Sequence, residues 1–154
     1  EQLLKNESIK NIIDGEWSLR AKQLQAILTN MSPLLKQKHI PLVVSGDFNS
    51  DSHLDWGEKT KHLNGHKGYV IEWPTSKLMQ ETGFKDSYRM MYPDVIKYPC
   101  LTWSTMAKNE LQYRIDFIYY KGENIKVVAS EMIDKHKVRF PSDHAALITT
   151  FKIK

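Results

Sequence analysis

The sequence predicts a single α/β (α+β) domain, and three observations support that class. Apolar residues recur at helical spacing between Trp17 and Lys36. A short β-branched run, Ile40 to Val44, follows them. The last third of the chain then alternates strand-like runs with polar or glycine-containing connections. One helix, one strand and a series of neighbouring strands indicate a helix layer packed on a mainly antiparallel sheet.

The expected helix is amphipathic, and its apolar positions are Leu24, Ile27, Leu28, Met31 and Leu35. Ser32-Pro33 interrupts it, either as a kink or as a new helix start with proline in the first turn. Residues 51–68 lack periodicity and indicate a long surface loop. Pro74 to Thr82 predicts a short helix that Gly83 ends.

The remaining strands are expected at Leu101–Ser104, Tyr113–Tyr120, Ile125–Ser130 and Ala145–Ile153. The stretch KGEN, residues 121–124, resembles a hairpin turn between the second and third of these. No repeat or linker divides the chain, so one structural unit is expected.

The composition is that of an ordinary globular domain, with 154 residues of which 41% are hydrophobic and 26% charged. The net charge of +4 suits a polyanionic substrate, although ordinary solubility explains it equally well. No apolar run approaches the roughly 18 to 20 residues of a transmembrane helix. The first residues carry neither a methionine nor a signal-peptide pattern, so the compartment is left open.

The first candidate site is SGDFN, residues 45–49, which ends the expected strand. Side chains alternate across an extended chain, so Asp47 and Asn49 point to one side and Phe48 to the other. A neighbouring carboxylate and carboxamide can ligate a hard divalent cation, orient a water or accept its proton. The same residues also suit the start of a plain turn, and both interpretations stay open.

The second candidate site is YRIDFIYY, residues 113–120, where Arg114 and Asp116 share one face of a strand. Burial of these charges is costly unless each finds a partner. They can pair with each other on an exposed face, or each can serve a site. The third candidate is the Asp143-His144 pair directly before the last strand, which puts a carboxylate and an imidazole at a strand mouth.

The three groups complement one another chemically. Together they suit the hydrolysis of a phosphate ester: metal-bound oxygen neutralises phosphoryl charge, a carboxylate positions or deprotonates water, and a held imidazole stabilises the transition state.

With GDFN, RIDFI and SDH in this order, the sequence resembles the second half of the endonuclease/exonuclease/phosphatase superfamily, which has the deoxyribonuclease-I-like fold. The stretches SLRAKQLQAIL, LTWS and FPSDHAAL are further similar to uncharacterised, often secreted bacterial members. The resemblance covers the chain from about Trp17 onward. It implies half of a four-layer α/β sandwich, with one mixed, mainly antiparallel sheet and an outer helix. Residues 1–154 would be the C-terminal part of one domain whose N-terminal half is absent.

The resemblance also implies roles for single residues. Asp47 would orient or deprotonate the attacking water, and Asn49 would contact the scissile phosphate or a second metal. Asp116 would orient the catalytic imidazole of His144, and Asp143 would bind metal. The implied cofactor is Mg²⁺ or Mn²⁺, with ligands among Asp143, Asp47, Asn49 and His144.

The implied function is that of a metal-dependent phosphoesterase, in the first place a phosphodiesterase. Its substrate would be nucleic acid, phospholipid or a small phosphodiester. The metal-binding Glu of the family's first half has no counterpart here, so this chain alone is expected to hydrolyse little. The inner face of its sheet is expected to be exposed, or covered by the missing half or by another chain. The alternative is a non-catalytic module that binds nucleic acid or protein. The bacterial resemblance favours a secreted or cell-envelope location.

Six further residues are candidates for shaping the substrate pocket: His53, Trp56, Trp73, Arg89, Trp103 and Arg114. For Trp73 and Trp103, packing in the core or on the sheet explains the residue equally well.

Overall fold

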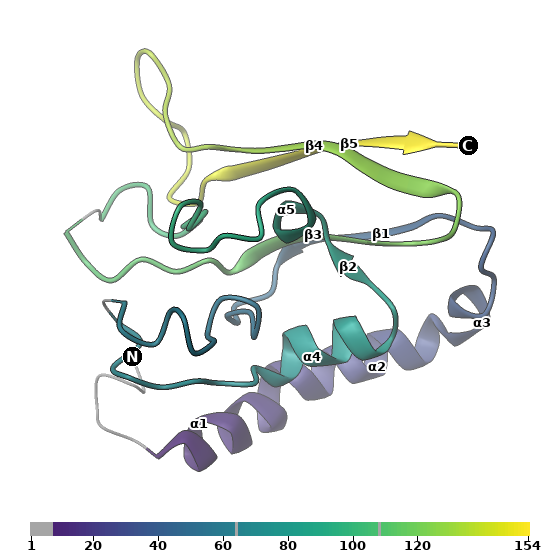
Figure 1. Ribbon diagram of the computed structural model, residues 1–154, viewed down its shortest axis with the longest axis horizontal. Coiled ribbons are helices and arrows are strands. Elements are labelled where there is room, and N and C mark those ends of the chain that lie inside the picture. Colours follow the sequence, from purple (N-terminus) through teal and green to yellow (C-terminus); the bar gives the residue numbers. More distant parts are fainter. Residues whose placement is uncertain (1–7, 64, 108) are drawn as a thin grey trace.

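The structure is a computed structural model that describes residues 8–63, 65–107 and 109–154. Figure 1 shows helices on one side of a central sheet and a two-stranded sheet on the other side. The combination of helices and antiparallel sheets confirms the α/β class expected from the sequence. Within the described residues, no helix has both the length and the apolar character needed to cross a bilayer.

The N-terminal helical layer consists of α1 (Ile9–Glu16), a π-helical turn η2 (Trp17–Ala21), α2 (Lys22–Asn30) and α3 (Ser32–Leu35). It begins eight residues earlier than expected, because Ser8 caps α1 by accepting a hydrogen bond from the amide of Asn11. Of the two possibilities for Ser32-Pro33, the structure has a new short helix with proline in its first turn. Helix α4 (Pro74–Glu81) agrees with its prediction, and Gly83 follows it at a φ of 91°.

The central sheet has the strand order β1-β3-β2 and is antiparallel, with β1 at Leu42–Asp47, β2 at Lys85–Asp86 and β3 at Asp116–Lys121. The β1–β3 register places Asp47 opposite Asp116 at the end of the ladder. Two of the three predicted motifs therefore meet at one sheet end. Helix α5 (Ser87–Met91) follows β2 directly and begins at Asp86, whose carboxylate caps the amides of Tyr88 and Arg89.

Among the described residues, strands β4 (Ile125–Ile133) and β5 (Ala146–Ile153) pair with each other alone and form a second sheet. The expectation of one sheet is therefore wrong. So is the expected hairpin at 121–124, because β3 and β4 are not paired there and the connection leads from one sheet to the other. Gly122 permits this path at a φ of 138°, where an added Cβ would lie 3.2 Å from the Cα of Pro41.

The main core lies between the helices and the central sheet. It joins Leu24 and Leu28 of α2 and Met79 of α4 to Phe117 and Tyr119 of β3. On the other face of β3, the ring of Tyr120 contacts that of Phe151 in β5 at a centroid distance of 5.3 Å. Because side chains alternate along β3, one face of this strand packs against the helices and the other contacts the β4–β5 sheet.

The loop after β1 is not the surface loop that its composition indicated. It has no regular secondary structure in its described part, but Ser52, Asp55, Trp56 and Thr60 are all buried. Trp56 packs with other apolar residues in a second core cluster that contains Ile12, Ile71 and Trp73. The segment at 101–104 differs too, because it forms only isolated bridges from Trp103 instead of a strand.

Candidate active site

Asp47 and Asn49 lie side by side at the end of β1. The backbone amide of Asn49 donates to Asp47 Oδ1 at 2.6 Å, and its side-chain amide donates to Oδ2 at 2.9 Å. Asn49 takes a φ of 49°, a left-handed conformation that asparagine tolerates better than most residues. Phe48 points the other way and packs edge-on against Phe117 at a centroid distance of 5.6 Å. The alternation expected from the sequence is therefore present.

Asp116 and His144 form the second part of the site. Asp116 Oδ2 lies 2.9 Å from Nδ1 of His144, which leaves the Nε2 atom for contact with a substrate. The contact with Asp116 is the main cause of a raised pKa for His144, and the nearby charges of Asp47 and Asp143 act in the same direction, against partial desolvation. A protonated imidazole therefore persists to higher pH than in a free histidine, and it can stabilise negative charge.

The segment around Trp103 holds this pair from behind. The amide of Ala145 donates to the carbonyl of Thr102 at 2.7 Å, next to a β-bridge between Trp103 and His144. The buried Thr102 hydroxyl accepts hydrogen bonds from the amides of Ile115 and Asp116 at 3.1 and 3.2 Å. Thr102 thereby fixes the backbone that carries Asp116, a role that the sequence alone did not indicate.

A pocket of about 600 Å³ brings the two pairs together. Asp47, Asn49 and His144 line it, and Trp73 and Trp103 contribute to its walls. Trp73 also packs at 79° against Trp56 in the second core cluster, so it serves both the pocket and the core. Three of the predicted catalytic residues therefore line one cavity, with Asp116 directly behind His144.

The N-terminal helices supply a side of this pocket that the sequence analysis missed. Glu16 and Arg20 both line it and lie 3.6 Å apart from Oε2 to Nη1. Glu16 is only 4% exposed, and the hydroxyl of Thr75 donates a hydrogen bond to its carboxylate. The i,i+4 spacing of Glu16 and Arg20 was the available signal, but the expected helix began at Trp17, one residue after Glu16.

Asp51 is a further carboxylate in the pocket wall. Desolvation is the main cause that raises its pKa from the ordinary 3.8 to about 7, while a hydrogen bond from Trp56 acts the other way. Repulsion by the charges of Asp55 and Glu16 adds to the increase. Around neutral pH this carboxyl group is therefore partly protonated.

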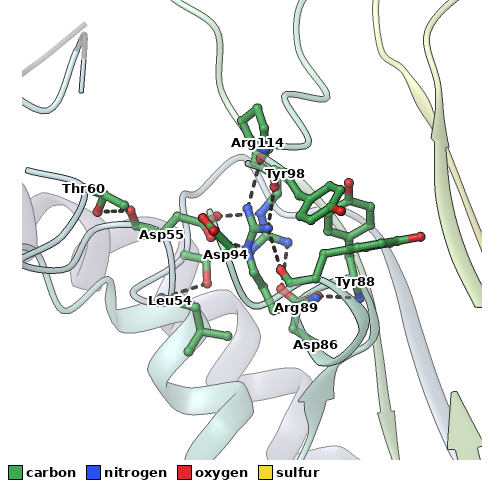
Figure 2. A network of polar contacts seen from close by, with 12 residues as sticks. Leu54, Asp55, Thr60, Asp86, Tyr88, Arg89, Asp94, Tyr98 and Arg114 are labelled. Atoms are coloured by element: carbon green, nitrogen blue, oxygen red, sulfur yellow. Dashed lines mark hydrogen bonds and ion pairs between the residues drawn. The ribbon is translucent and has the colours of Figure 1, made fainter. Parts of the chain in front are cut away.

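The two predicted arginines lie elsewhere, in the buried polar network of Figure 2. Arg114 donates to Asp55 at 2.5 Å and to Asp86 at 2.7 Å, and Arg89 donates to Asp55 at 2.6 Å. Arg89 also donates to the carbonyls of residues 92, 98 and 99. Arg114 and Asp116 are thus not paired with each other: the first enters this network and the second holds His144. Neither arginine lines the pocket around Asp47.

Other predicted residues are placed as follows. His53 lines a different cavity of about 460 Å³ next to α4 and α5, where its Nδ1 atom lies 2.8 Å from the hydroxyl of Ser76. Trp56 is buried and stacks on His66 at 3.8 Å. Asp143 is exposed and outside the pocket wall, although its charge reaches His144. The substrate-binding roles of His53, Trp56, Arg89 and Arg114 stay predictions.

The side chains suit a hard divalent cation in kind. Carboxylate and amide oxygens are the ligands that Mg²⁺ prefers, and Mg²⁺ commonly takes only one or two carboxylates together with water and substrate phosphate. Asp47 and Asn49 provide such oxygens in the pocket. In the part of the chain that the structure describes, no group of three or more His, Cys, Asp or Glu side chains forms a cation site by itself.

Comparisons with known proteins identify relatives of this chain. An uncharacterised protein of Caenorhabditis elegans is 34% identical over 168 residues, which cover 94% of this chain and 52% of that protein. Nocturnin of Rattus norvegicus is 25% identical over 142 residues, covering 86% of this chain and 29% of nocturnin. The 3'-5'-exoribonuclease subunit Ccr4 of the CCR4-Not complex of Kluyveromyces lactis is 29% identical over 156 residues, which cover 85% of this chain and 19% of Ccr4.

The chain thus spans about half the length of the nematode relative and less of the others. These relatives are eukaryotic, so the expected affinity to a bacterial branch finds no support in them. The sequence profile of the Endonuclease/Exonuclease/phosphatase family matches residues 18–144, most of the chain and all three motifs. This protein therefore belongs to the endonuclease/exonuclease/phosphatase family.

Proposed function

We propose that the natural protein carrying this sequence is a metal-dependent phosphodiesterase, with nucleic acid as its substrate class. One observation carries the proposal: the Asp47–Asn49 and Asp116–His144 pairs meet at one pocket, although Asp116 stands 69 positions after Asp47 in the sequence. The name of the Ccr4 relative, an exoribonuclease subunit, supports the choice of nucleic acid.

Each residue has a distinct task in this proposal. Asp47 orients the attacking water and accepts its proton, and Asn49 holds that carboxylate in place through two hydrogen bonds. His144, protonated through its contact with Asp116, donates from Nε2 to a phosphoryl oxygen as negative charge develops. Bound Mg²⁺ or Mn²⁺, with ligands from Asp47, Asn49 or Asp143, would supply charge neutralisation at the phosphate, whereas the protonated His144 has no free nitrogen lone pair for a metal.

The chain is, in this proposal, the C-terminal part of the catalytic domain, and turnover needs the remaining part. The alternative is a non-catalytic binding module, which the lack of a three-residue cation site among the described residues would suit. Hydrolysis of bis-p-nitrophenyl phosphate separates the two. The natural protein should turn over with Mg²⁺ or Mn²⁺ and lose that activity in EDTA, while the chain alone should show little.

Two results would contradict the proposal. Turnover that survives EDTA would remove the role of the cation. If the natural protein binds an RNA oligonucleotide but hydrolyses neither the oligonucleotide nor the model diester under any of these conditions, the binding-module alternative holds.

A further inference from the structure

We propose that Arg20 is a substrate-binding residue that holds a second phosphate, next to the phosphate that is cleaved. This inference rests on the proposed function and goes beyond it, because it assigns the pocket to substrates with at least two neighbouring phosphates. It gives a role to the N-terminal helical segment, which the catalytic groups do not use.

The charges in the pocket wall are the first support. Asp47, Asp51 and Glu16 are acidic, and a phosphodiester carries a negative charge at each phosphate. Arg20 is the single lysine or arginine among the described residues of this wall, so besides His144 it is the group that can attract an anion. An arginine presents five N–H donors in a planar fork that matches phosphate oxygens.

The local geometry is the second support. The side chain of Arg20 is 40% exposed while that of Glu16 is 3% exposed, so the carboxylate holds the guanidinium from the protein side. Thr75 in turn holds Glu16. The ion pair with Glu16, at 3.6 Å, is the polar contact that the described residues give Arg20. Most of its donors therefore remain available to a ligand, in contrast to those of Arg89.

The π-helical turn is the third support. Residues 17–21 depart from α-helical hydrogen bonding, between two regular helices. Such turns are frequent at functional sites, because they redirect side chains at some cost in helix stability. Here the turn contains Arg20 and Leu19, and both line the pocket.

The test compares two ligands that share one diester and differ in flanking phosphates: thymidylyl-thymidine (TpT) and the same dinucleotide with 5'- and 3'-terminal phosphates (pTpTp). Wild-type natural protein should have a kcat/KM about tenfold higher for pTpTp than for TpT, which is the effect expected from one additional charge-assisted hydrogen bond. Arg20→Gln should lose most of this preference through KM. Lys22→Gln, which removes a charge from an exposed neighbouring site, should keep it. Equal use of both ligands by the wild type, or an undiminished preference in Arg20→Gln, would overturn the inference.

Nuclear magnetic resonance of the wild type gives a readout that needs neither turnover nor a variant. The Arg20 Nε–Hε signal should shift on titration with pTpTp and stay in place with TpT. A signal that moves with neither ligand would overturn the role of Arg20. If no substrate is hydrolysed but this signal responds to pTpTp alone, the proposed catalysis fails and the phosphate-binding role stands.

Discussion

His144 shows how a single contact sets the chemistry of the site. Its imidazole is held by Asp116 at 2.9 Å, and this contact is the main cause of its raised pKa. A raised histidine pKa in the folded state stabilises the protein fully below the unfolded value of about 6.5, and the effect is lost as the pH rises through the folded pKa. In the proposed reaction the same protonation provides the positive charge at the phosphate.

Replacing Asp116 with Asn should lower the pKa of His144, because the charge and the acceptor that favour the imidazolium are lost. Titration of the imidazole resonances by nuclear magnetic resonance measures this directly. Diester hydrolysis by the natural protein should fall by about 10²-fold or more, as expected when an imidazole loses its orienting carboxylate. An unchanged pKa with near-normal turnover would show that the Asp116–His144 contact has no catalytic role.

Asp51 makes a prediction of the opposite sign. Its pKa is raised to about 7, so the folded state resists ionisation that the unfolded chain undergoes near pH 4. Stability from this group therefore decreases as the pH rises from about 4 to about 7. Asp51→Asn should stabilise the protein against urea, and the gain should be about 2 kcal/mol larger at about pH 8 than at about pH 5. Asp14→Asn, at an exposed position, is the control. A gain for Asp51→Asn that does not depend on pH would contradict the account.

At the scale of elements, the loop after β1 is fixed by charge as well as by apolar packing. Asp55 accepts from both Arg89 and Arg114, and Arg114 also binds Asp86, which caps α5 (Figure 2). The network therefore ties the loop, the start of α5 and the segment before β3 into one unit. Arg114 stands two residues before Asp116, so the network fixes the segment that leads into β3.

Asp55→Asn should destabilise the protein by about 3 kcal/mol or more, because it leaves two buried guanidinium groups without their shared counter-charge. Urea unfolding followed by circular dichroism measures this change. The matched control is Glu58→Gln in the same loop, where the exposed pair with Lys61 should contribute less than about 1 kcal/mol. Equal effects of the two substitutions would show that the network is not the main support of the loop.

Local sequence predicted the direction of side chains correctly where the alternation along a strand determines it. GDFN at the end of β1 and the alternation in β3 follow from the period of a strand, and both were predicted. The hairpin at 121–124 was not, because its residues allow a tight turn and only the choice of sheet by β4 rules it out. The loop that contains Asp55 has no periodic pattern, and the arginine partners of Asp55 are 34 and 59 residues away in the sequence. Neither its burial nor its ion pairs could therefore be predicted.

The same distinction applies to the candidate site. Asp47, Asn49, Asp116 and His144 stand in recognisable motifs at strand ends, so the sequence indicated them. Thr102 acts through backbone amides 13 and 14 residues further on, and no local pattern indicates such contacts.

For the whole molecule, the exposed apolar side chains are the feature that stands out. Val43 of β1, Val128 of β4 and Ile148 of β5 are each more than 40% exposed, and Ile153 is 61% exposed. The chain spans about half the length of its nematode relative. We therefore propose that the remaining part of the domain, or a second chain, covers these exposed side chains of β1, β4 and β5.

The chain alone should consequently self-associate or bind an apolar dye such as anilinonaphthalene sulfonate, whereas the natural protein should do so less. Gel filtration with light scattering, together with dye fluorescence, tests this. A monomeric chain without dye binding would contradict the proposal that these strands need a cover.

The most direct test of the proposed catalytic centre is the hydrolysis of bis-p-nitrophenyl phosphate by the natural protein in Mg²⁺, with His144→Ala beside His136→Ala, an exposed histidine outside the pocket. The account predicts that kcat/KM falls by about 10²-fold or more for His144→Ala and stays near the wild-type value for His136→Ala. Wild-type activity in both variants would show that phosphodiester hydrolysis does not occur at the pocket formed by Asp47, Asn49, Asp116 and His144.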